Sequence, residues 1–192
     1  MGMRLQDSDL LPGEHMILSK AANAIVSLRE TGIAKYGLAE LMIEMGMRDA
    51  DGIGGKAHLT NFRILFKSHF FNRVRGSFSV FLPNVQSVPK WFNGIFVETD
   101  TQSFQFEMWH SPPFIQAAND AVAAFSAEST ADLVKNIMAH IAVIDPTLEG
   151  LATQQSIGEM AAGAHSLPSV IRDLKIFHKI TLLQIIGLMR PR

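Results

Sequence analysis

The sequence predicts an α+β protein in which an antiparallel sheet comes first and helices follow. Between residues 54 and 107, apolar and polar side chains alternate with a period of two, as in strands that bury one face. From residue 112 onward, apolar side chains recur every three or four positions, as along amphipathic helices. A run of strands followed by a run of helices is typical of an α+β fold.

Seven short strands are expected. A first strand falls within "EHMILSKAANAIV", and a hairpin covers "GGKAHLTNFRILFK". Breaks rich in Pro, Asn and Gly separate the remaining strands. The seven predicted strands are 15–20, the two arms of the 54–67 hairpin, 77–81, 85–88, 94–99 and 103–108.

The 54–67 hairpin defines two faces. With Thr60-Asn61 at the turn, Leu59 opposes Phe62, Ala57 opposes Ile64 and His58 opposes Arg63. One face then carries the apolar set Ala57, Leu59, Phe62, Ile64 and Phe66. The other face carries Lys56, His58, Arg63, Leu65 and Lys67. We therefore predict a sheet with an apolar inside and a cationic outside.

Helices are predicted within one long connection and throughout the last third of the chain. Ser111 followed by Pro112 and Pro113 is a helix-start pattern, with Ser111 as the N-cap. An alanine-rich region follows, and its helices are separated by Asp145-Pro146 and Ser166-Leu167-Pro168. The predicted helices are 37–47, 112–125, 128–143, 149–163 and a last, highly apolar one from about 166 to the end.

Charge is unevenly distributed along the 192 residues. The net charge is −1, yet no Asp or Glu lies between Asp51 and Glu98, where six Lys and Arg residues fall. Acidic residues gather instead in the N-terminal region, for example Asp7, Asp9 and Glu14. Such segregation favours a protein with one charged surface rather than a uniformly basic nucleic-acid binder.

The composition limits which cellular compartment and which kinds of chemical site we expect. With no Cys, the chain has neither disulfides nor thiolate metal sites. No apolar run approaches the roughly 18–20 residues of a membrane-spanning helix. The first residues lack the apolar core of a signal peptide, and Gln6 breaks the myristoylation pattern after Gly2. We expect a cytoplasmic chain that is at most peripheral at a membrane.

The segment "GGKAHLTNFRILFKSHFFNRVRGSFSVFLPNVQSV" (54–88) resembles the GRAM domain, a member of the pleckstrin-homology-like superfold. The resemblance lies in the Gly-rich start, the Leu-Thr-Asn turn before a basic residue and an apolar strand, and the spacing of Leu82, Val85 and Val88. It extends more weakly over about 13–125. It involves fold residues and no catalytic motif.

The resemblance implies a bent, split antiparallel barrel of seven strands capped by a helix. The domain would span 13–125 with a helical insertion at about 27–52, and 126–192 would be an additional helical tail. Family members associate with membrane lipids, often anionic ones, or with protein partners.

Two functional hypotheses follow. In the first, a non-catalytic adaptor binds anionic membrane lipid, because each Lys or Arg near such a surface contributes about 1 kcal/mol. The alternative for these cations is a solvated outer face that discourages edge-to-edge aggregation. The candidate lipid-binding residues are Lys56, His58, Arg63, Lys67, Arg73 and Arg75.

The second hypothesis is a protein-interaction or self-association module built from the C-terminal helix. This helix is apolar around most of its circumference, so it packs on the barrel, on another copy of the chain, or on a membrane surface. A homo-oligomer would also present two cationic faces together. The candidate interface residues are Ile171, Leu174, Phe177, Ile180, Leu183 and Ile186.

Other chemistries receive little support. The seven His residues show no metal-ligand spacing, so we expect neither a metal site nor a cofactor. "DGIGG" lacks the Lys and Ser/Thr of a phosphate loop, and no Ser lies in a nucleophile elbow, so we expect no enzyme. Trp91, Phe92 and Trp109 could stack on bases, but no RNA-binding motif accompanies them, and no nucleic-acid partner is expected.

Overall fold

The computed structural model describes residues 5–27, 50–69, 72, 76–100, 102–145 and 176–188. The strands in this part of the chain are β1 (Met16–Ser27), β2 (Ala50–Thr60), β3 (Arg63–Ser68), β4 (Ser77–Phe81), β5 (Val85–Ser87), β6 (Lys90–Trp91), β7 (Gly94–Thr99) and β8 (Ser103–Glu107). The helices are η1 (Asp7–Asp9), η3 (Leu82–Asn84), α2 (Pro112–Ala123), α3 (Ala127–Ala139), α4 (Ile141–Ile144) and α8 (Ile176–Leu188).

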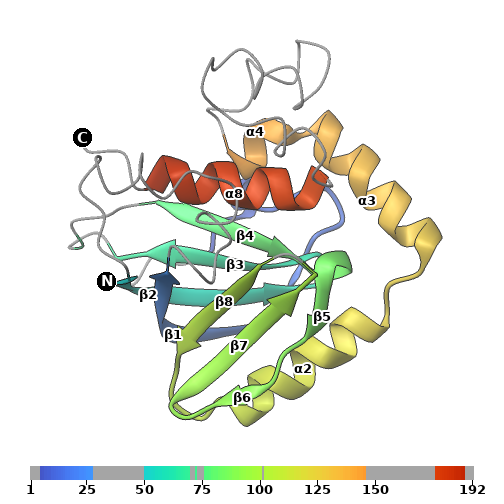
Figure 1. Ribbon diagram of the computed structural model, residues 1–192. Helices are drawn as coiled ribbons and strands as arrows, with labels where there is room; N and C mark the ends of the chain where they lie inside the picture. The colour runs from blue at the N-terminus through green and yellow to red at the C-terminus, as the bar shows by residue number, and fades with distance from the viewer. Residues whose placement is uncertain are drawn as a thin grey trace.

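The strands form one open antiparallel sheet of eight strands, in the order β4-β3-β2-β1-β8-β7-β5 with β6 paired to β7. The long strand β1 joins two groups, because it pairs with β2 along its length and with β8 through Asn23, Ala24 and Ile25. Figure 1 shows β7 and β8 crossing the direction of β2 to β4 steeply. The sheet therefore bends around β1 and encloses apolar side chains between its two groups of strands.

The register of the β2–β3 hairpin differs from the sequence prediction by two residues. Leu59 pairs with Ile64, Ala57 with Phe66 and His58 with Leu65. The turn is longer than predicted because the Thr60 hydroxyl accepts hydrogen bonds from the N–H groups of residues 62 and 63, at 3.1 and 3.0 Å. A shift of two preserves the side-chain alternation, so the predicted faces hold for the paired residues. Phe62, which was predicted on the apolar face, lies in the turn instead and is partly buried against a separate apolar cluster.

Aromatic rings fill the space between the two groups of strands. Phe66 and Phe78 come from one group, and Phe104 and Phe106 come from β8. Their ring centroids lie 5.4 to 6.0 Å apart. Gly94 allows β7 to approach β8 here, since a Cβ at this position would fall 1.8 Å from the carbonyl oxygen of Phe106. The core thus joins both halves of the sheet.

A second apolar cluster lies on the other face of β3 and β4. It brings the N-terminal segment (residues 5–15) together with the sheet and with α3, α4 and α8. The rings of Phe81 and Phe177 lie 5.1 Å apart between their centroids. The buried members are Leu11, Phe81, Leu133, Ile137, Ile141, Ile144, Phe177 and Ile180. This face of the sheet is therefore covered by other parts of the chain.

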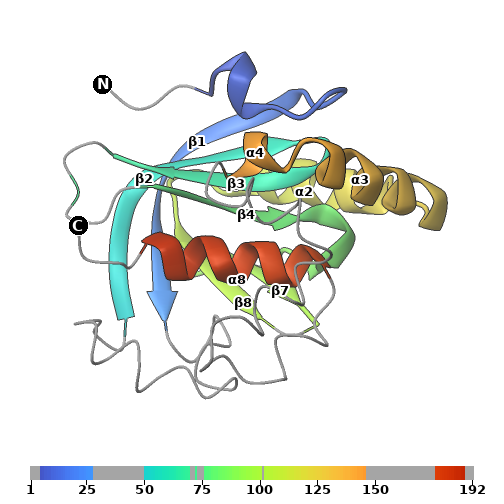
Figure 2. The same cartoon turned by 90° about the horizontal axis from the view of Figure 1, so that it is seen from above.

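Helix α8 also covers the edge of the sheet at β4. The Thr181 hydroxyl donates to the carbonyl oxygen of Ser79 at 2.5 Å, and the Ser79 N–H donates to Gln184 Oε1 at 2.8 Å. Gln184 Nε2 in turn donates to the carbonyl oxygen of Ile144 at 3.0 Å. Figures 1 and 2 show α8 alongside β4, with α4 next to it. Two side chains thus replace the backbone partners that a neighbouring strand would supply.

Most predicted elements are present within the described residues. The predicted strands at 77–81 and 94–99 match β4 and β7, and those at 85–88 and 103–108 are each one residue too long. The first strand is longer than predicted, and the two-residue strand β6 was missed because it is too short to show an alternation. The sheet therefore has eight strands in the described part of the chain, where seven were predicted.

The helices follow the predicted order with two differences in detail. The helix predicted at 112–125 is α2, which begins at Pro112 but receives no side-chain cap from Ser111. The helix predicted at 128–143 is divided at His140 into α3 and α4. Part of the last predicted helix is α8. The predicted helices 37–47 and 149–163 lie outside the described residues.

Candidate functional site

The cationic residue at the start of β3, Arg63, is buried in a hydrogen-bonded ion pair. Its Nε lies 2.9 Å from Glu14 Oε1, and both side chains are at most 1% exposed. Arg63 also donates to Glu14 Oε2 at 3.1 Å, to Ser79 Oγ at 3.0 Å and to the carbonyl oxygen of Asp9 at 2.6 Å. Glu14 further accepts from the Leu11 N–H and the Thr60 hydroxyl, at 2.8 and 2.7 Å. This guanidinium stabilises the fold and is inaccessible to a ligand.

Lys67 is paired with the same N-terminal segment. Its Nζ lies 2.6 Å from Asp9 Oδ2, and the Lys67 side chain is 10% exposed. Partial burial raises the pKa of Asp9, but hydrogen bonds from Lys67 and the Gln6 N–H, with the charges of Lys67 and Arg63, outweigh it. The pKa of Asp9 therefore lies below its ordinary value, which favours its carboxylate form beside Lys67.

The predicted solvent-facing cationic surface is thus wrong for His58, Arg63 and Lys67, all of which are buried. The reason is that the acidic N-terminal segment and the second apolar cluster cover this face of the sheet. Lys56 is half-buried and pairs with Lys67 across the hairpin. Arg73 and Arg75 lie outside the described residues.

The predicted interface residues on the C-terminal helix also face inward where they are described. Phe177 and Ile180 are buried in the second apolar cluster, and Leu183 is partly buried against it. This agrees with the alternative in which the helix packs on its own chain. Ile171, Leu174 and the side chain of Ile186 lie outside the description.

The most exposed large apolar side chains in the described part of the chain are Phe92 and Trp109, at 86% and 88%. Phe92 lies in the two-residue turn between β6 and β7, and Trp109 lies in the turn between β8 and α2. Strand pairing places these turns side by side, since Gly94 pairs with Glu107 and the Met108 N–H donates to the carbonyl oxygen of Asn93 at 2.9 Å. We call this paired set, Phe92 and Trp109, the aromatic end.

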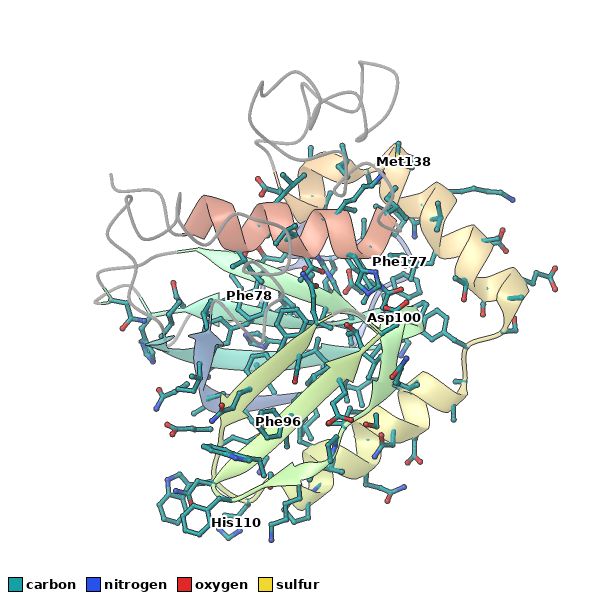
Figure 3. All side chains as sticks on the ribbon, viewed as in Figure 1. Phe78, Phe96, Asp100, His110, Met138 and Phe177 are labelled. Atoms are coloured by element: carbon teal, nitrogen blue, oxygen red, sulfur yellow. The ribbon has the colours of Figure 1, made fainter. Side chains whose placement is uncertain are left out.

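A lysine and an unusual backbone conformation hold the Trp109 turn in place. His110 has a φ of 51°, in the left-handed region that few residues other than glycine adopt. Lys20 Nζ donates to the carbonyl oxygen of His110 at 2.9 Å and approaches that of Trp109 at 3.5 Å. Figure 3 shows His110 at the opposite extreme of the molecule from Met138 on α3. Trp109 is thus presented to solvent by a turn that is tied to β1.

A groove of about 660 Å³ lies beside the aromatic end. Phe92 and Trp109 form part of its wall, and Lys90 and Glu107 contribute one charge of each sign. Asn23 Nδ2 donates to Glu107 Oε2 at a long 3.4 Å. Ligand sites combine apolar and aromatic walls with a few polar groups in this way, within a volume of about 300–1,000 Å³.

Sequence reasoning weighed these aromatic residues only as a base-stacking surface. The overlooked signal is their position in turns, where apolar side chains have no core to enter. Phe92 precedes Asn93, and Trp109 stands shortly before Ser111-Pro112-Pro113. Large aromatic residues at such breaks indicate a contact surface.

The described residues form neither a metal site nor a membrane-spanning helix. In the part of the chain described, no three His, Asp or Glu side chains gather closely enough to hold a metal ion. None of the described helices combines the length and hydropathy needed to cross a bilayer. Neither a comparison with known protein-family models nor a search of curated proteins finds a match for this chain.

Proposed function

We propose that this chain is a non-catalytic, cytoplasmic adaptor with a pleckstrin-homology-like barrel of the GRAM type, attached peripherally to membrane lipid through its aromatic end. The observation that carries this proposal is the exposure of Phe92 and Trp109 on two adjacent turns. The antiparallel order of the strands and the helix α2 after the last of them support the barrel. The membrane contact differs in place from the basic sheet face that the sequence suggested.

Aromatic side chains favour the boundary between water and hydrocarbon. A Trp ring has a large apolar body and an N–H donor, which suits the polar headgroup region of a bilayer. Burying a Phe-sized side chain is worth about 1.5–3 kcal/mol, or about a 10- to 150-fold change in partitioning. Two rings that enter the interface together would therefore provide reversible attachment.

Electrostatics would contribute less than the sequence suggested. Lys20 and Lys90 lie near the aromatic end, but Glu107 offsets one of these charges. Each cation near an anionic surface adds about 1 kcal/mol, and salt screens this contribution. We therefore expect binding that persists at physiological salt and does not require a strongly anionic membrane.

Vesicle co-sedimentation tests the proposal directly. The double variant Phe92→Ala/Trp109→Ala should bind at least about 10-fold more weakly than the unchanged chain, because both inserted rings are lost. Met138→Ala is the matched control, since Met138 is 37% exposed and lies at the far side of the molecule. In a Trp91→Phe background, Trp109 fluorescence should shift to shorter wavelength when vesicles are added.

Two results would overturn the proposal. One is vesicle binding by the double variant equal to that of the unchanged chain. The other is no binding of the unchanged chain to neutral or anionic vesicles, even at low salt. In the second case the aromatic end would have to bind a protein partner, because exposed Trp and Phe are also typical anchors of protein interfaces.

A further inference from the structure

The groove beside the aromatic end presents opposite charges within one cavity. Lys90 lies on β6 and Glu107 at the end of β8, and both of these strands pair with the start of β7, which therefore holds the two residues on either side of it. Their formal charges cancel. A ligand with a single charge would meet repulsion from one of the two, whereas a ligand with both charges would meet an attractive partner at each end.

The negative part of the groove suits an organic cation. Glu107 is half-buried, and the amide that contacts it does so at 3.4 Å, which leaves its carboxylate able to accept another partner. Phe92 and Trp109 line the same groove. Aromatic faces beside a carboxylate attract quaternary ammonium groups, because the negative face of each ring quadrupole interacts with the cation.

The positive part of the groove suits a phosphate. Lys90 is exposed and lines the groove, and Asn93, three residues further along the chain, is a second polar lining residue. A lysine ammonium binds phosphate oxygens as a point charge, and an amide N–H can add a hydrogen bond. The two ends together accommodate an ammonium group and a phosphate in one molecule.

From this arrangement we propose that the groove binds a phosphocholine group. Glu107 and the two rings would contact the trimethylammonium group, and Lys90 would contact the phosphate. The inference rests on the proposed function, because such a group forms the headgroup of a zwitterionic membrane lipid. At the aromatic end, the groove would meet that headgroup while the rings enter the interface. Soluble phosphocholine carries the same chemistry, so the test must separate the two sources.

Calorimetric titration of the full chain with phosphocholine, choline and inorganic phosphate tests the groove. Phosphocholine should bind more tightly than either part alone. Glu107→Gln should weaken phosphocholine binding by about 10-fold or more, because a charge-assisted contact is lost while the amide preserves the shape. The matched control is Glu98→Gln at the other end of β7, where Glu98 pairs with Ser103.

Vesicles of phosphatidylcholine and of phosphatidylglycerol supply the second part of the test. Preference for phosphatidylcholine that disappears in Glu107→Gln supports the lipid headgroup as ligand. Binding of soluble phosphocholine without vesicle attachment supports the groove chemistry but overturns the membrane function. Equal phosphocholine binding by Glu107→Gln and the unchanged chain overturns the groove inference. If vesicle binding is then lost only in Phe92→Ala/Trp109→Ala, the proposed membrane attachment is still supported.

Discussion

Replacement of Arg63 by methionine tests whether this residue holds the fold or contacts a ligand. Methionine keeps much of the aliphatic length but removes the guanidinium, and Glu14 then remains buried at 0% exposure without its cationic partner. Breaking a buried ion pair on one side costs about 3–5 kcal/mol, against a typical total stability of about 5–15 kcal/mol. We therefore expect Arg63→Met to lose a large part of its free energy of unfolding.

Urea denaturation followed by circular dichroism gives the measurement. With a slope near 2 kcal/mol/M, the expected loss moves the unfolding midpoint down by about 1.5–2.5 M urea. The double variant Glu14→Gln/Arg63→Met should recover part of this, because a neutral amide can still accept from the Leu11 N–H or the Thr60 hydroxyl. Lys135→Met is the control, since the Lys135–Asp132 pair is exposed and is worth at most about 1 kcal/mol.

The same variant distinguishes between a structural role and a ligand-binding role for Arg63 on β3. Folded Arg63→Met should bind vesicles as the unchanged chain does, because Arg63 is 1% exposed. A midpoint shift below about 0.5 M urea, together with lost vesicle binding, would refute the structural role. The basic face would then again be the preferred ligand site.

Two further predictions concern the edge of the sheet and the N-terminal segment. Gln184→Leu should lower the free energy of unfolding by about 1–3 kcal/mol, because the buried Ser79 N–H loses its acceptor. Thermal unfolding should then show a lower midpoint temperature. An unchanged midpoint would mean that another group satisfies this N–H. Because Lys67 lowers the pKa of Asp9, the pair stabilises the folded state above about pH 4 and loses that contribution as the pH falls through the lowered value. Asp9→Asn should therefore reduce the free energy of unfolding at pH 7 and make it fall less steeply below pH 4. Urea titrations at several pH values measure both effects. A fall as steep as that of the unchanged chain would contradict this assignment.

Local sequence pattern was sufficient to predict most of the strands and their faces. In the β2–β3 hairpin, the alternation of Leu59, Ile64 and Phe66 with polar neighbours assigned each residue to its correct side even though the register was shifted by two. This succeeds because strand side chains alternate with a period of two, and a shift of two residues leaves that alternation unchanged. Helix α2 could also be predicted, from the prolines at its start and the apolar side chains along one face.

The environment of the polar face could not be derived in this way. Arg63 and Lys67 were interpreted as exposed because such residues are rarely buried unless they are paired. Their partners Glu14 and Asp9 are 49 and 58 residues away along the chain. Only the folded chain brings these charges together, and no local pattern encodes a contact across that separation.

Local sequence patterns were enough to predict the α+β class, the order of strands before helices and the apolar face of the sheet, since these depend on interactions between near neighbours. Three features depend on tertiary structure. They are the helix that covers β4, the carboxylates that pair with Arg63 and Lys67 of β3, and the proximity of the turns that carry Phe92 and Trp109. The last of these follows from the pairing of β7 with β8, which brings two separate turns to one end of the sheet. Long-range strand pairing and burial decide such contacts, because they depend on where distant segments meet in space.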